Sequence, residues 1–372
     1  MSMTHKERLL AACRGDHLEK LPYGPRIDLW YNFHNAHGTL PEKYQGRSMM
    51  DILRDLGVGG QYRYYAVVKE EVDDVEIVET DNPPYLRTGY RTPYGTVTKT
   101  MMFNPHEGAW IGYESEKLFK SEKDYAAIKY VLEHTTPVPD PGYVDACKEV
   151  GEDGLVMTGI RGWSAPQRVM REIMGYELFF YELMDRPAQV EELLEVVKEL
   201  DRKKLEIVAD TDIELVNICG NWSDDIHTPV FKKYFTPWFK EVNEFLHARG
   251  KLSMSHIDGE NKRLLPLLRE TGIDVWEAWT PVPMTKVTTA ELRQAVGEDC
   301  VVWGGIPATL FSPTTSDEEF DDFIVNTLFA EIKPGYGFVV GMGDNLPFDS
   351  SIERVRRVAE LIDEYGNLPL TP

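Results

Sequence analysis

From about residue 120 onward, short apolar runs alternate with longer stretches in which apolar positions recur every three or four residues. The short runs predict β-strands and the longer stretches predict helices. The predicted strands are Leu155–Ile160, Leu215–Cys219, Leu252–Ile257, Asp274–Trp279, Val301–Gly305 and Phe338–Met342. The predicted helices cover residues 167–184, 187–209, 229–249, 261–271, 288–296, 317–331 and 351–365. Apolar strands alternating with helices are typical of a parallel sheet covered by helices.

The first third of the chain has a different pattern. Residues 4–14 predict an amphipathic helix, and Pro22–Trp30 predicts a first extended segment. Residues 74–104 alternate and turn, which predicts an antiparallel β-hairpin excursion. The later succession favours a closed (β/α)8 TIM barrel over an open doubly wound sheet, since no GxGxxG or GxxxxGK[ST] motif supports nucleotide binding. We expect residues 1–372 to form one α/β barrel domain with the hairpin as an insertion.

Charge and composition narrow the class of protein. The formal net charge of −22 argues against a nucleic-acid partner, because phosphate neutralisation needs clustered Lys and Arg. The sequence has no apolar run long enough for a membrane span, and its start lacks the apolar core of a signal peptide. The four widely spaced cysteines include no CxxC pair, so neither a disulfide framework nor a thiolate zinc knot is expected. We expect a cytoplasmic protein.

Histidine and acidic residues occur at the ends of several predicted strands. His256 and Asp258 are two residues apart, so they share a face of their strand, while Glu277 and Asp344 end two later strands. In a barrel these ends meet at one rim, which predicts a metal site or an acid-base site formed by all four residues. A structural histidine and an Asx-turn at Asp258 are the simpler alternatives. Glu277 lies in an apolar strand, so it needs a partner or a metal ion.

Other candidates lie in the loops that follow the predicted strands. Arg161, Asp225 and His227 are polar residues that would orient a substrate at the rim, and Trp163 and Trp279 are aromatic residues there. Core packing explains any single tryptophan equally well. As a group, the aromatic side chains suit a flat apolar ligand.

Several segments stand in a characteristic order: Glu7–Gly15, Met174–Pro187, Ser223–Asp225, Ser255–Gly259, Val302–Pro307 and Gly341–Pro347. Together they resemble the uroporphyrinogen decarboxylase superfamily, and within it the cobamide-dependent methyltransferase branch, which implies a (β/α)8 barrel. The Arg-Gln-Ala-Gly-Arg-Tyr signature of the porphyrinogen decarboxylases is replaced here by Gly24–His34. The thiol-methylating members hold zinc with His-x-Cys and a later Gly-Cys, whereas the matching positions here are His256-x-Asp258 and Gly343-Asp344. Hard ligands in place of soft ones argue against a thiol substrate.

The remaining resemblance is to ether-cleaving members, which pass a methyl group from a methoxylated aromatic compound to a corrinoid protein. It implies a zinc ion held by His256, Asp258, Asp344 and Glu277. It also implies that Glu277, His256 and Asp258 act in catalysis. No base-off cobamide motif (Asp-x-His-x-x-Gly) occurs, so the cobamide must arrive on a separate corrinoid partner. Glu277 with a raised pKa, acting as general acid, is the metal-free alternative. A metal-independent carboxy-lyase and a non-catalytic subunit remain open, as does a homodimer.

A second spacing, Glu191-x14-Glu206-x20-His227, looks like a zinc pattern proposed for those demethylases. Both glutamates fall in the predicted helix 187–209. Fifteen residues of helix span roughly 22 Å, too far for two ligands of one zinc ion. The spacing therefore indicates family membership more than the place of the metal.

Overall fold

The computed structural model describes residues 3–63, 67–103, 112–160 and 164–371. The chain divides into two compact units. The first comprises residues 1–65, 141–158 and 213–372, and the second comprises residues 66–140 and 159–212. Each is described by itself. The expectation of a single domain stays a prediction.

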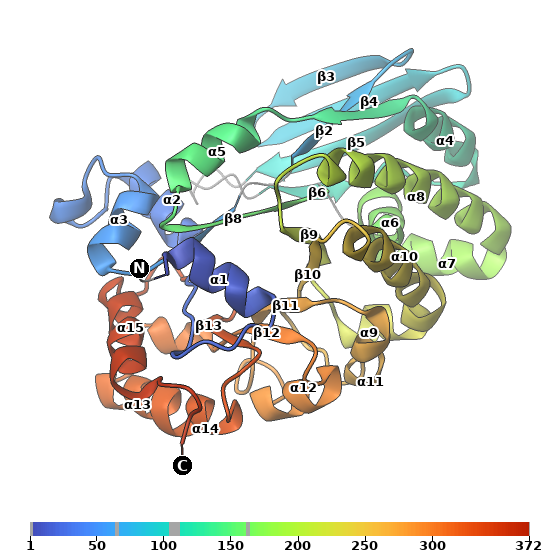
Figure 1. The fold of residues 1–372 in the computed structure, drawn as a ribbon. Coiled ribbons are helices and arrows are strands. Elements are labelled where there is room, and N and C mark those ends of the chain that lie inside the picture. Colours follow the sequence, from blue (N-terminus) through green and yellow to red (C-terminus); the bar gives the residue numbers. More distant parts are fainter. Residues whose placement is uncertain (1–2, 64–66, 104–111, 161–163, 372) are drawn as a thin grey trace. The chain divides into compact units, whose positions relative to one another are not determined.

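A curled, parallel seven-stranded sheet forms the centre of the first unit (Figure 1). Its strands, in spatial order, are β1 (Gly60–Arg63), β8 (Gly154–Gly159), β9 (Leu215–Gly220), β10 (Leu252–His256), β11 (Val275–Trp279), β12 (Val301–Ile306) and β13 (Phe338–Met342). The backbone of Pro22 and Gly24 is hydrogen-bonded to Val340 of β13, and Pro25 accepts a hydrogen bond from Gln61 of β1. This short segment therefore connects the two edges of the sheet and gives it a barrel-like course.

Apolar side chains fill the interior of the curled sheet. Met254, Val275, Trp303 and Val339 are each at most 1% exposed and belong to one core cluster. Helix α1 (His5–Cys13) contributes Leu9 and other residues to the same cluster, and its start is fixed by a capping box. The polar residues discussed below lie further along these strands, beyond the apolar layer.

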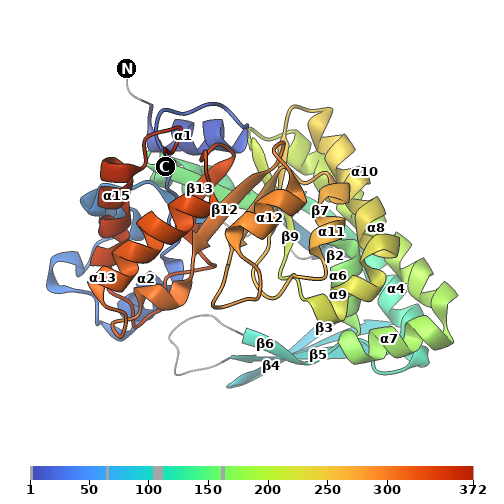
Figure 2. The ribbon, with the colours of Figure 1, turned by 90° about the horizontal axis from the view of Figure 1, so that it is seen from below.

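Helices lie on the outer side of these strands (Figure 2). They are α2 (Asp28–His37), α3 (Met49–Leu56), α5 (Gly142–Val150), α9 (Asp224–Val230), α10 (Thr236–His247), α11 (Leu265–Leu268), α12 (Thr289–Val296), α13 (Asp317–Asp322), α14 (Phe329–Glu331) and α15 (Glu353–Tyr365). Short 3-10 segments are η1 (Glu42–Tyr44), η5 (Arg269–Thr271) and η6 (Ala308–Phe311). Two π-helical segments, η4 (Phe231–Phe235) and η7 (Phe323–Leu328), continue α9 and α13.

The second unit contains antiparallel strands and its own helices. Strands β3 (Glu76–Asn82), β4 (Tyr85–Thr92), β5 (Gly95–Phe103) and β6 (Gly112–Glu116) form one sheet, and β2 (Val68–Val72) pairs with β7 (Thr135–Pro139). The helical segments are η2 (Glu122–Asp124), α4 (Tyr125–Glu133), α6 (Ala165–Gln167), η3 (Arg168–Ile173), α7 (Tyr176–Asp185) and α8 (Pro187–Ala209). Among the described residues, no helix combines the length and apolar character that crossing a membrane requires.

The predicted strands from residue 155 onward are confirmed, with ends that differ by at most one residue. Two N-terminal predictions need correction. The extended prediction for Pro22–Trp30 is wrong at its end, because α2 begins at Asp28. The hairpin at 74–104 is confirmed only in part, since β6 and the β2–β7 pair enlarge the antiparallel region.

The predicted helix 167–184 is also interrupted. Gly175, with a φ of +79°, separates the segment η3 from α7.

Candidate active site

The site is built from the ends of three strands of the first unit. His256 is the last residue of β10, Glu277 lies in β11, and Asp344 follows β13 by two residues. His256 and Glu277 are directly paired in the β10–β11 register. Parallel strands present their carboxyl ends at one edge, so residues distant in sequence meet there.

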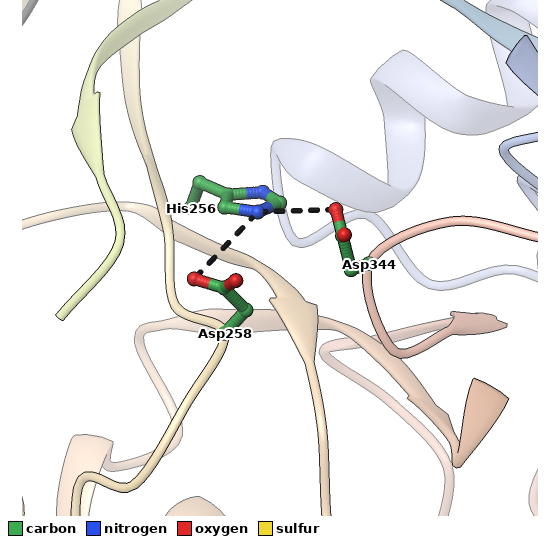
Figure 3. A group of neighbouring side chains, drawn as sticks. All are labelled: His256, Asp258 and Asp344. Atoms are coloured by element: carbon green, nitrogen blue, oxygen red, sulfur yellow. Dashed lines mark ion pairs between the residues drawn. The ribbon is translucent and has the colours of Figure 1, made fainter. Parts of the chain in front are cut away.

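His256 lies at the centre of this group (Figure 3). Its Nδ1 donates a hydrogen bond of 2.7 Å to Oε2 of Glu277. Its Nε2 lies 3.3 Å from Oδ1 of Asp344 and 3.8 Å from Oδ1 of Asp258. One donor atom each from His256, Asp258 and Asp344 lies within 4.8 Å of the others. The described residues thus include a His/Asp/Asp triad that could hold a metal ion, with Glu277 behind it.

Glu277 is 1% exposed and paired with two basic side chains. Oε1 accepts a 2.5 Å hydrogen bond from Nη2 of Arg63, and Oε2 faces His256. Burial alone would raise the pKa of Glu277, but the positive charges of Arg63 and His256 outweigh it and hold that pKa well below its usual range. The prediction of a raised pKa for Glu277 is therefore wrong, and the metal-free alternative that relies on this raised pKa loses its physical basis.

The proton of this pair lies on the imidazole instead. Burial disfavours the charged ring, yet the carboxylates of Glu277 and Asp344 raise the pKa of His256 to about 9. Without a metal ion, His256 is therefore an imidazolium at neutral pH, and Nε2 carries the proton that faces the two aspartates.

Arg26 fixes Asp344 from the other side. Its Nη1 donates a 2.6 Å hydrogen bond to Oδ1 of Asp344, and its Nε and Nη2 bind the two carboxylate oxygens of Asp28. Burial tends to raise the pKa of Asp344, but the hydrogen bond from His256 and the charge of Arg26 lower it. Asp344 is therefore an anion, ready to serve as an acceptor or a ligand.

The backbone around the triad is closely packed. A Cβ on Gly220 would lie 2.5 Å from Cβ of His256, so only glycine lets β9 approach β10 here. Asn221 follows at φ +59° and donates to Oδ2 of Asp258 at 3.3 Å. Asp344 also has a positive φ, +69°. Asn and Asp adopt this left-handed region more readily than most residues do. At Asn221 this conformation places a donor next to Asp258, and at Asp344 it orients the carboxylate of the residue itself.

Trp279 lies away from the triad. The β11–β12 register shifts between Glu277 and Trp279, and Ala278 has a φ of +63°, which together define a β-bulge. The bulge interrupts the alternation that would have placed both residues on one face. The Trp279 side chain is fully buried, and its indole N–H donates to Oγ1 of Thr289 in α12. This placement puts the indole in the helix layer.

His227 and Asp225 belong to α9. His227 is 1% exposed and packs against Trp222 and Phe235. The indole N–H of Trp222 donates to Oγ of Ser255, the strand neighbour of His256, whose side chain points to the opposite face. His227 therefore lies on the helix side of β10. Asp225 is exposed and forms an ion pair with Arg263.

Two further predicted residues, Arg161 and Trp163, lie outside the described residues. Glu191 and Glu206 lie in the single uninterrupted helix α8. Their fifteen-residue separation along it corresponds to roughly 22 Å, so the structure agrees that they cannot ligate one zinc ion together.

Residues 120–365, more than half of the chain, match the model of the family described as Uroporphyrinogen decarboxylase (URO-D). The chain belongs to this family. A methyltransferase from Methanosarcina mazei has a similar structure, with a TM-score of 0.60 over 98% of this chain and 99% of that chain. The two share 14% sequence identity, so the likeness shows a common fold.

Another solved structure, a dipeptide epimerase from Methylococcus capsulatus complexed with Mg ion, matches 79% of each chain at 12% identity. Its TM-score of 0.21 is too low to carry an argument. No curated protein matches the sequence.

Two arginines in this URO-D family member acquire roles that the sequence did not reveal. Arg26 and Arg63 are basic residues near the predicted rim, and both are paired with acids of the site. A signal for Arg63 was available, because Glu277 in an apolar strand required a partner. No pattern in the sequence indicates which cation would provide it.

Proposed function

We propose that this chain is a methyltransferase that moves a methyl group from a methoxylated aromatic compound to Co(I) of a separate corrinoid protein. The observation that carries the proposal is the triad of His256, Asp258 and Asp344, which combines one imidazole with two hard carboxylate donors. Membership of the URO-D family and the fold shared with a methyltransferase support it. Backbone hydrogen bonds of residues 22–25 connect the two edge strands of the sheet. This connection supports a (β/α)8 barrel whose open end receives the substrate.

The triad fits a zinc ion. Ligand atoms about 2.1 Å from a tetrahedral zinc ion lie roughly 3.4 Å apart. Nε2 of His256 is already 3.3 Å from Oδ1 of Asp344 and 3.8 Å from Oδ1 of Asp258. The other nitrogen of His256 donates to a carboxylate, the usual arrangement behind a metal-bound histidine. His256, Asp258 and Asp344 would hold the ion and leave a fourth position for the substrate.

Bound zinc would supply Lewis acidity at the ether oxygen. Methyl transfer to Co(I) of the partner would form a cobalt–carbon bond and break the carbon–oxygen bond of the ether, whose electron pair would go to the aryloxide. The chain orients the ether in line with this attack and excludes water from the mouth. Carboxylate ligands suit this chemistry, because they favour an oxygen donor over a thiolate in the fourth position.

His256 offers a metal-free version of the same step. Since the pKa of His256 is raised to about 9, its Nε2–H is a proton donor at neutral pH. That proton would neutralise the aryloxide as the methyl group leaves. Glu277, which stays anionic, would then stabilise the imidazolium instead of acting as the acid.

The test is incubation of the purified chain with a panel of methoxylated phenols and a reduced corrinoid protein, with methyl-Co(III) absorbance as readout. The proposal requires methyl transfer that is lost in Asp258→Ala and Asp344→Ala. Zinc content of wild type and His256→Ala separates the two versions. Full zinc retention by His256→Ala defeats the metal-assisted one.

A carboxy-lyase is the second candidate, favoured by the family to which the chain belongs. It would need cations to hold substrate carboxylates, and Arg26 and Arg63 are both engaged with acids. Release of CO2 from an aromatic or tetrapyrrole acid, with no methyl transfer, would establish it. Neither activity, together with no metal binding, would indicate a non-catalytic subunit.

A further inference from the structure

Behind the triad, Arg63, Glu277 and His256 form a continuous line of contacts. Both oxygens of the Glu277 carboxylate are engaged, one by Nη2 of Arg63 and one by Nδ1 of His256. The donor atoms that lie within 4.8 Å of one another belong to His256, Asp258 and Asp344 and do not include Glu277. Within the described part of the chain, Glu277 therefore contacts the imidazole from behind, on the side away from the two aspartates.

Burial makes this carboxylate dependent on Arg63. Glu277 is 1% exposed and lies beyond an apolar layer that includes Val275 and Trp303. An anion in such a place requires a compensating cation, because water cannot stabilise it. The side chain of Arg63, in β1, is 13% exposed and reaches across the interior to provide that charge.

The direction of the His256 ring depends in turn on Glu277. A carboxylate only accepts hydrogen bonds, so Nδ1 of His256 must be the donor in the 2.7 Å contact. Once Nδ1 is engaged in this way, Nε2 is the nitrogen that faces Asp258 and Asp344. The two contacts made by Glu277 therefore determine which imidazole nitrogen is available to a ligand.

We infer that Arg63 is a positioning residue: through Glu277 it fixes the ring orientation and tautomer of His256, so that Nε2 is presented to a metal ion. Glu277 thereby changes from a predicted metal ligand to the carboxylate that orients one. The inference deepens the proposed function and rests on it for the metal ion, whereas the arrangement of hydrogen bonds can be tested without metal.

The first measurement is zinc affinity, determined by competition with a chelator on the full-length protein. Arg63→Gln should bind zinc at least about tenfold more weakly than wild type, the usual effect of removing a partner behind a metal ligand. Arg63→Lys keeps the charge and should recover most of the affinity. Arg168→Gln is a matched control, since Arg168 is another buried arginine with a bidentate glutamate partner, Glu70. It should lower stability without changing zinc affinity.

The second measurement is the hydrogen bond that Nδ1 of His256 donates to Glu277 in the metal-free protein, read from the ¹⁵N and ¹H chemical shifts of the ring N–H groups. Wild type should show a protonated Nδ1 in a strong hydrogen bond, and Arg63→Gln should lose this signature. If Arg63→Gln does not fold, the double variant Arg63→Gln/Glu277→Gln removes both buried charges together and is compared with Glu277→Gln alone. Because Arg63 acts through Glu277, its loss should add nothing to the effect of Glu277→Gln in either measurement, and a further loss would overturn the inference. A merely structural role for Arg63 would leave the ring nitrogens as they are in wild type.

The outcomes separate the two claims. Wild-type zinc affinity and an unchanged Nδ1 hydrogen bond in folded Arg63→Gln overturn the inference and leave the proposed function standing. If wild type binds no zinc through His256, the metal-assisted function fails. Loss of the Nδ1 signature in Arg63→Gln would in that case still support the positioning role.

Discussion

One oxygen of Asp344 contacts two residues that are more than 200 positions apart in the chain: Oδ1 accepts a 2.6 Å hydrogen bond from Arg26 and lies 3.3 Å from Nε2 of His256. The contact holds the carboxylate in place in the free protein, since Arg26 is itself anchored by Asp28. Asp344 is thus oriented in advance of any ligand, which lowers the entropy cost of binding. This orientation requires a strained backbone at Asp344, with φ at +69°.

The strain at Asp344 can be measured by comparing two variants that both lack the carboxylate. Asp344→Gly should be more stable than Asp344→Ala by about 1–2 kcal/mol, because glycine adopts positive φ without a Cβ penalty. Urea unfolding of both proteins measures the difference. Both should lose at least about tenfold in zinc affinity, so stability and metal binding separate at this position. Equal stability of the two variants would mean that the loop relaxes and that Asp344 stores no strain.

Gly220 is the second backbone position on which the triad depends. In Gly220→Ala the new Cβ would meet Cβ of His256 at 2.5 Å, and neither backbone can easily move within the sheet. We expect a loss of about 1–3 kcal/mol in stability and a displaced imidazole. Gly89→Ala is the control, since its Cβ would meet Val78 and Thr98 at an ordinary 3.6 Å. Zinc affinity should fall in Gly220→Ala only, and an unchanged affinity would show that His256 tolerates the shift.

The positions of His256, Glu277 and Asp344 were predictable because they follow from alternation within each strand and from the parallel order of successive strands. Their partners Arg63 and Arg26 could not be predicted, because they come from a distant part of the sequence that the fold brings next to these strands. The pKa of Glu277 was assigned the wrong direction for the same reason: burial is visible in an apolar strand, while the cation that overrides it lies more than 200 residues away.

The placement of Trp279 shows a different limit. Its strand is apolar and was recognised, but the bulge at Ala278 leaves no clear mark in the sequence. One extra residue in a strand moves every later side chain to the opposite face of the sheet. A correctly predicted strand therefore did not settle to which face the Trp279 side chain points.

Trp279→Phe tests whether this indole binds substrate or supports the fold. The substitution removes the hydrogen bond to Thr289 and part of the buried surface, so we expect a loss of about 1–3 kcal/mol in stability. KM for the methoxylated substrate should stay within about twofold of wild type, since the indole faces α12. A large rise in KM with unchanged stability would instead indicate that Trp279 contacts the substrate.

The second unit contains a buried ionic group whose titration should be visible in stability. Asp201 is 1% exposed, and Lys204, at 3.5 Å, is its cationic neighbour. Lys204 also binds Glu70, which accepts two hydrogen bonds from Arg168. Burial raises the pKa of Asp201 to about 6, against the lowering effect of Lys204 and Arg168. Glu70 has the opposite shift, since Arg168 and Lys204 overcome its burial and lower its pKa to about 2.

The sign of the Asp201 effect follows from proton linkage. Between about pH 4 and 6 the folded protein holds a proton on Asp201 that the unfolded chain has released, so stability falls as pH rises through this window. A shift of about two pKa units corresponds to roughly 3 kcal/mol. Glu70 acts below this window, since its contribution to stability is present above about pH 4.5 and is lost toward pH 2.

Asp201→Asn should remove the decline in stability between pH 4 and 6. Glu199→Gln, an exposed change in the same helix, should retain it. Urea unfolding at half-unit pH steps gives the slopes, and parallel slopes for wild type and Asp201→Asn would show that Asp201 titrates normally.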